Sequence, residues 1–72
     1  MYSIELTNEA QKDLKNITKK DVEIILKKIF SIKNNPKHYL ERLKGIDLHK
    51  LRIGDYRAII RLDNKLKIVY II

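Results

Sequence analysis

The fold of this chain is decided by the stretch Leu48-His49-Lys50-Leu51-Arg52-Ile53-Gly54-Asp55-Tyr56-Arg57-Ala58-Ile59-Ile60-Arg61-Leu62. Up to Ile53 the side chains alternate at the two-residue period of a strand. Gly54-Asp55 has the composition of a two-residue hairpin loop. The sequence therefore predicts two antiparallel strands, over residues 48–53 and 56–62.

The two-residue loop fixes the pairing within this hairpin. Ile53 is expected opposite Tyr56, and Arg52 opposite Arg57, because pairing runs outward from the loop one residue at a time. One face, the expected core side, then carries His49, Leu51, Ile53, Tyr56, Ala58 and Ile60. The other face carries Leu48, Lys50, Arg52, Arg57, Ile59 and Arg61.

The last strand, residues 66–72, is expected to continue the meander. If Leu62, Leu66, Ile68 and Tyr70 point inward, the loop is Asp63 to Lys65. Arg61 then lies beside Lys67, Ile59 beside Val69, and Arg57 beside Ile71. The face without helices is predicted to combine a row of cations with an apolar strip that a partner covers, formed by Ile59, Val69 and Ile71.

The first half of the chain predicts one strand and two helices. Residues 2–6 alternate as a strand, and Thr7 is an N-cap for a helix that ends near Asn16. Thr18 is a second N-cap, for a helix that runs to about residue 34, before Pro36. A helical turn is expected over residues 39–43. The prediction is an α+β domain with an antiparallel sheet (β-α-α-β-β-β) and a helical hairpin on one face.

The composition fits one small basic domain over residues 1–72. Sixteen Lys and Arg against nine Asp and Glu give a net charge of +7, which attracts polyanions such as RNA. There is no cysteine, and the N-terminus has no signal-peptide pattern. A soluble, cytoplasmic protein without a metal site or a cofactor is expected.

The facing arginines Arg52 and Arg57 are the most informative pair. Like charges placed opposite each other destabilise a sheet, so a cluster of one sign is more natural where an anion or a partner's carboxylates bind. The alternative is a solvated surface whose long side chains bend apart. Clustered cations suit phosphate contact, which favours the functional interpretation.

Five segments together resemble the RelE/ParE toxins. They are Tyr2-Ser3-Ile4-Glu5-Leu6, Ala10-Gln11-Lys12-Asp13-Leu14, Asn35-Pro36, Arg42-Leu43-Lys44-Gly45 and Leu51-Arg52-Ile53-Gly54-Asp55-Tyr56-Arg57. The resemblance covers nearly the whole chain, and the Arg-Ile-Gly-Asp-Tyr-Arg stretch is its most specific part.

The resemblance implies the toxin of a type II toxin–antitoxin system, held by a cognate antitoxin protein. In the RelE branch it implies an mRNA interferase, a metal-independent endoribonuclease that cleaves mRNA in the ribosomal A site, and operator DNA bound only through the antitoxin complex. Arg57 matches the family's arginine in the second hairpin strand and Lys50 a lysine in the strand before it, so these are the candidate catalytic residues. Arg52, Arg61 and Lys67 are the candidate RNA- or phosphate-binding residues.

Two departures keep a second function open. Leu48 stands where many active members have a second lysine. Many members also continue beyond the position of Ile72 with a basic segment that contains an arginine and a tyrosine, and Tyr70 is expected to point into the core. The alternative is a non-enzymatic binding module, either a ParE-like topoisomerase inhibitor or an inactive toxin remnant that only binds an antitoxin.

Overall fold

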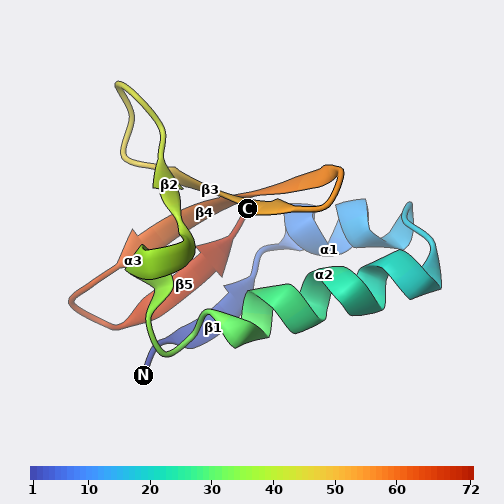
Figure 1. Ribbon diagram of the computed structural model, residues 1–72, viewed down its shortest axis with the longest axis horizontal. Coiled ribbons are helices and arrows are strands. Elements are labelled where there is room, and N and C mark those ends of the chain that lie inside the picture. Colours follow the sequence, from blue (N-terminus) through green and yellow to red (C-terminus); the bar gives the residue numbers. More distant parts are fainter.

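The computed structural model describes residues 1–72 and contains one five-stranded sheet (Figure 1). The strands are β1 (Ser3–Leu6), β2 (Glu41–Arg42), β3 (His49–Ile53), β4 (Tyr56–Asp63) and β5 (Ile68–Ile71), in the order β1-β5-β4-β3-β2. The helices are α1 (Asn8–Lys15), α2 (Lys19–Ser31) and α3 (Pro36–Tyr39). The predicted α+β class is confirmed, and no helix is long and apolar enough to cross a membrane.

Both N-caps of the helical hairpin are present as predicted. The Thr7 hydroxyl accepts a hydrogen bond of 3.2 Å from the Ala10 amide at the start of α1. The Thr18 hydroxyl accepts one of 3.3 Å from the Asp21 amide at the start of α2. Each bond satisfies an amide that has no partner within its helix. The helices then lie side by side (Figure 1).

The core lies between the helical hairpin and one face of the sheet. Its fully or almost fully buried side chains are Ala10, Ile25, Ile29 and Ile32 from the helical part and Leu51, Ile53, Ile60, Val69 and Ile71 from the strands. Burial of each large aliphatic side chain contributes about 1.5–3 kcal/mol. The sheet face away from this core is called the uncovered face below.

The first predicted hairpin is confirmed in every pair. Ile53 lies opposite Tyr56, Arg52 opposite Arg57, and Lys50 opposite Ile59. The loop is Gly54-Asp55, and Gly54 has a φ of +57°, a conformation that costs glycine little. The uncovered face therefore carries Lys50, Arg52, Arg57, Ile59 and Arg61, as the sequence predicts.

The predicted register of the second hairpin is wrong. Arg61 pairs with Tyr70, and Leu62 with Val69, so the loop is residues 64–67. The Asp63 carboxylate shapes it by accepting hydrogen bonds from the Lys65 and Leu66 amides, at 3.0 and 2.8 Å. The change exchanges the two faces of β5. Tyr70 consequently lies on the uncovered face, not in the core.

Two further details differ from the expected antiparallel meander. β1 joins the sheet at its edge and pairs with β5 in parallel. The helical turn expected over residues 39–43 lies earlier, as α3, with Pro36 in its first turn. Residues 41–42 instead form β2, which pairs with β3 through Glu41 to Lys50 and Arg42 to His49.

Candidate functional site

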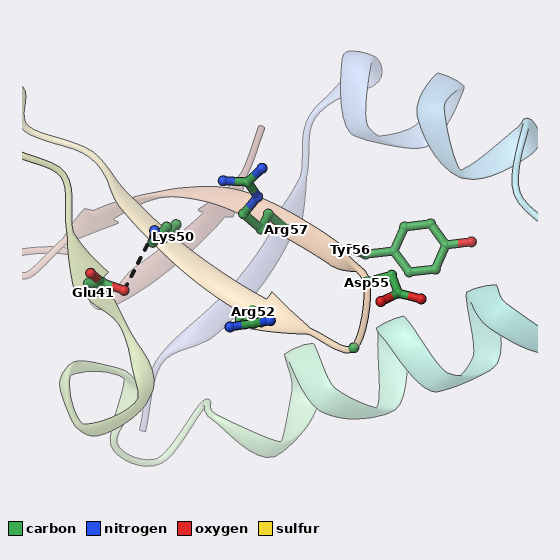
Figure 2. A pocket seen from close by; sticks show the side chains of 7 residues that line it. Glu41, Lys50, Arg52, Asp55, Tyr56 and Arg57 are labelled. Carbon is green, nitrogen blue, oxygen red and sulfur yellow. Dashed lines mark ion pairs between the residues drawn. The ribbon is translucent and has the colours of Figure 1, made fainter.

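Three of the predicted site residues line one pocket at the end of the β3–β4 hairpin (Figure 2). The pocket has a volume of about 350 Å³, and its lining is polar except for one aromatic ring. It is formed by Glu41, Lys50, Arg52, Gly54, Asp55, Tyr56 and Arg57. Lys50, Arg52 and Arg57 therefore come together, and they do so because β3 and β4 pair in the predicted register.

The charge of this pocket is only partly neutralised. The Lys50 ammonium lies 3.7 Å from the Glu41 carboxylate, the one ion pair within the pocket. Neither Arg52 nor Arg57 has a carboxylate oxygen within 4.0 Å, and the chain's other ion pair joins Arg42 to Asp47. The pocket thus presents two unpaired guanidinium groups, which suits binding of a phosphate or a carboxylate.

The opposed arginines avoid each other in the present conformation. Figure 2 shows the side chains of Arg52 and Arg57 extending to different sides of the hairpin. This separation reduces the like-charge repulsion expected for a facing pair. Arg57 also contributes to a neighbouring, mostly apolar pocket with Asp13 and Ile72. Arg57 therefore lines both a polar pocket and a mostly apolar one.

The hairpin loop beside the pocket is tied to α2. The Tyr56 hydroxyl donates a hydrogen bond of 2.8 Å to the Asp21 carboxylate. This bond, with smaller contributions from desolvation and from the negative charges of Asp21 and Asp55, raises the pKa of Tyr56 above its ordinary value. The bond restrains the start of β4, where Arg57 follows directly.

The other two predicted phosphate-binding residues lie outside this pocket. Arg61 is on the uncovered face, with its guanidinium carbon 4.2 Å from the centre of the Tyr70 ring. Lys67 is in the β4–β5 loop with a φ of +58°, and its ammonium lies 5.2 Å from the centre of the Tyr2 ring. The predicted contact between Arg61 and Lys67 is wrong, because the pairing partner of Arg61 is Tyr70.

The predicted apolar partner strip does not exist as a surface. Val69 and Ile71 are 0% and 4% exposed and belong to the core. Only Ile59 of the three lies on the uncovered face, and it is half-buried. The physical reason is again the register of β5, which turns Val69 and Ile71 toward the helices.

Glu41, Tyr56 and Tyr70 are the neighbours of the cations that the sequence did not identify. Glu41 belongs to a strand of two residues, which is too short to show a period. Tyr56 was assigned to the core by its parity, yet it is 37% exposed and bonds to Asp21. Tyr70 lies in an apolar run in which both parities are plausible.

Comparison with known proteins identifies the family. A sequence profile described as the ParE toxin of the type II toxin–antitoxin system parDE matches residues 4–72. The chain belongs to this toxin family. No curated protein sequence is similar enough to the toxin to count as a match.

Solved structures agree with this assignment at the level of the fold. A chain of the RelBE2 toxin–antitoxin complex from Mycobacterium tuberculosis has a TM-score of 0.92 and 22% identity over 97% of the toxin and 90% of that chain. A chain of the intact RelBE complex from E. coli has a TM-score of 0.81 and 18% identity, over 99% of the toxin and 90% of that chain. A chain of the archaeal RelE–RelB complex from Pyrococcus horikoshii OT3 has a TM-score of 0.81 and 25% identity, over 97% of the toxin and 88% of that chain.

Proposed function

We propose that this toxin is a ribosome-dependent endoribonuclease that cleaves mRNA and is neutralised by a cognate antitoxin. The observation that supports this most is the pocket in which Lys50, Arg52 and Arg57 meet with a single carboxylate ion pair among them. A surplus of positive charge favours binding of a phosphodiester, and it stabilises the additional negative charge that develops on the phosphate during cleavage.

Each cation has a defined part in the proposed reaction. The ribose 2′-oxygen loses its proton and attacks the adjacent phosphorus, and the bond to the 5′-oxygen breaks as that oxygen is protonated. The products are a 2′,3′-cyclic phosphate and a 5′-hydroxyl. Arg57 stabilises the negative charge of the phosphorane, and Lys50 contacts the same phosphate. Arg52 binds the neighbouring part of the mRNA backbone. The ribosome supplies the alignment of the mRNA.

The proposed antitoxin neutralises the toxin by covering charge and apolar surface together. RelE–RelB and RelBE relatives were solved as toxin–antitoxin complexes. In this chain α2 leaves Ile24 about half exposed beside Lys27 and Lys28, and Phe30 of the same helix is also about half exposed. An amphipathic helix with acidic and apolar residues fits such a surface.

The test is mapping of mRNA ends in a reconstituted translation reaction with the purified chain. Cuts are expected in mRNA on ribosomes and not in free mRNA. Arg57→Ala should lower the cleavage rate by about 10²–10³-fold, the usual effect of removing one group that stabilises transition-state charge. Arg42→Ala is the matched control, because Arg42 lies outside the pocket and pairs with Asp47.

The alternative of a ParE-like topoisomerase inhibitor has a specific observation in its favour, which is the match to the ParE family profile over residues 4–72. A gyrase supercoiling assay separates the two functions. Intact mRNA together with loss of supercoiling would contradict the endoribonuclease proposal. Cleaved mRNA with unchanged supercoiling would support it.

A further inference from the structure

Tyr70 and Arg61 form a stacked pair on the uncovered face, outside the pocket described above. The Arg61 guanidinium carbon lies 4.2 Å from the ring centre, and the two residues are direct partners in the β4–β5 ladder. Tyr70 is half-buried, so its ring is held by the sheet while part of it stays accessible. The pair is therefore a fixed, partly exposed aromatic and cationic surface.

Arg61 stacks on the ring although two carboxylates are nearby in the ladder. Glu5 lies beside Tyr70 on the neighbouring strand β1, and no ion pair joins it to Arg61. Asp63, on the same strand and face as Arg61, uses its carboxylate to accept the Lys65 and Leu66 amides. The charge of Arg61 is thus not neutralised within the protein and is available to an anion.

The pair also continues the surface that leads to the pocket. Arg57, Ile59 and Arg61 alternate along β4 on the uncovered face. Cations follow the phosphates of a single strand of nucleic acid, and aromatic rings bind its bases by stacking. A surface with Arg57 at one end and the Arg61–Tyr70 pair at the other can therefore contact phosphates and a base at different places along one nucleic-acid strand.

We propose that Tyr70 and Arg61 bind one nucleotide of single-stranded RNA, with the base against the aromatic surface and the adjacent phosphate on the Arg61 guanidinium. This inference rests on the proposed function, because it extends the RNA path from the pocket across the sheet. It assigns Tyr70 to binding and not to chemistry, since the ring lies outside the pocket that holds Arg57.

The test compares two short oligomers by fluorescence anisotropy at low salt, without ribosomes. One is single-stranded RNA, and the other is an oligomer of equal length and charge whose nucleotides lack bases. Tyr70→Leu should weaken binding of the RNA by about 5- to 100-fold, the range for losing one stacked base, and leave the baseless oligomer unchanged. Tyr70→Phe should bind both oligomers like the parent chain.

Tyr39→Leu is the matched control, because Tyr39 is also an exposed tyrosine under a cation, with the Lys28 ammonium 5.1 Å from its ring. It lies on α3 beside Lys28 of α2, whereas the proposed path follows β4 and β5. A melting curve confirms that each variant folds. Equal weakening of both oligomers by Tyr70→Leu, or no weakening of either, would overturn the proposal and leave the pair as a sheet-stabilising contact.

Failure here is distinguishable from failure of the endoribonuclease proposal. Oligomer binding is measured without cleavage, whereas Arg57→Ala is judged by cleavage on ribosomes. Ribosomal cleavage with no effect of Tyr70→Leu on oligomer binding would overturn only the nucleotide site. Base-dependent binding through Tyr70 with no cleavage would support the site and contradict the enzymatic function.

Discussion

The Tyr56 hydroxyl on β4 donates a 2.8 Å hydrogen bond to the Asp21 carboxylate on α2, across 35 residues of sequence. Only the neutral phenol can donate this bond, so it raises the pKa of Tyr56 above the ordinary 10.0. Its stabilising contribution is complete below pH 10.0 and is lost as the pH rises through the raised pKa of the folded state.

Tyr56→Phe is therefore expected to be less stable than the parent chain at neutral pH, with the difference shrinking under alkaline conditions. Urea unfolding of both chains at several pH values from about 8 to about 11 measures this difference in stability. Lysine side chains also titrate in this range, but they affect both chains alike and cancel in the comparison. Asp21→Asn tests the partner, and should also lower the pKa of Tyr56 in an absorbance titration. A stability difference that grows above pH 10 would contradict the assignment.

The ion pair between Lys50 and Glu41 limits the charge of the pocket. Glu41→Gln frees Lys50 and should tighten binding of single-stranded RNA by less than about 5-fold, since a partly exposed pair is worth about 0.2–1 kcal/mol. The dependence of the binding constant on salt concentration should also become steeper. Glu23→Gln on α2 makes the same charge change away from the pocket, so it is the control. Equal effects of the two variants would mean that only net charge matters.

The register of β5 has a direct mutational test in two isoleucines of one strand. Ile71→Ala removes a core side chain and should lower the free energy of unfolding by about 2–5 kcal/mol. Ile68→Ala, on the opposite face, should cost clearly less. Chemical denaturation of both variants gives the comparison, and a larger loss for Ile68→Ala would restore the register expected from the sequence.

Ile68 and Ile71 also show why the sequence predicts the first hairpin correctly and the second one incorrectly. Gly54-Asp55 leaves one choice for a tight loop, and the alternating strands beside it accept one register. β5 is apolar at both parities, so hydrophobicity did not choose a face. The register is set by features that no local pattern reveals. They are the hydrogen bonds that the Asp63 carboxylate accepts in the loop, the 2.8 Å bond from the Ser3 amide to the Lys67 carbonyl, and the positive φ of Lys67.

The candidate site was predicted to the same extent as the strands that carry it. Lys50, Arg52 and Arg57 share the pocket because they lie on the correctly predicted hairpin. The structure places Lys67, Val69 and Ile71 differently from the prediction, because Lys67 lies in the second loop and the other two follow it. Glu41 was out of reach, since the two-residue strand that positions it is defined only by pairing with β3.

Gly54 connects loop geometry to stability. Its φ is +57°, and a Cβ added there would meet no atom within 4 Å, so the cost of Gly54→Ala is conformational and not steric. The variant should lose about 1–2 kcal/mol. Gly54→Asn should lose less, because asparagine tolerates this conformation better. Thermal or urea unfolding measures both, and equal losses would point to a cause other than the backbone.

The position of β5 between β1 and β4 has a consequence for synthesis. β1 is made first, but its hydrogen-bonding partner is made last, in parallel with it. While residues 68–71 are still inside the ribosomal exit tunnel, the N-terminal strand has no neighbour to pair with. The complete sheet can therefore assemble only after residues 68–71 have left the tunnel, and an antitoxin that recognises the finished sheet can capture it only from that point on.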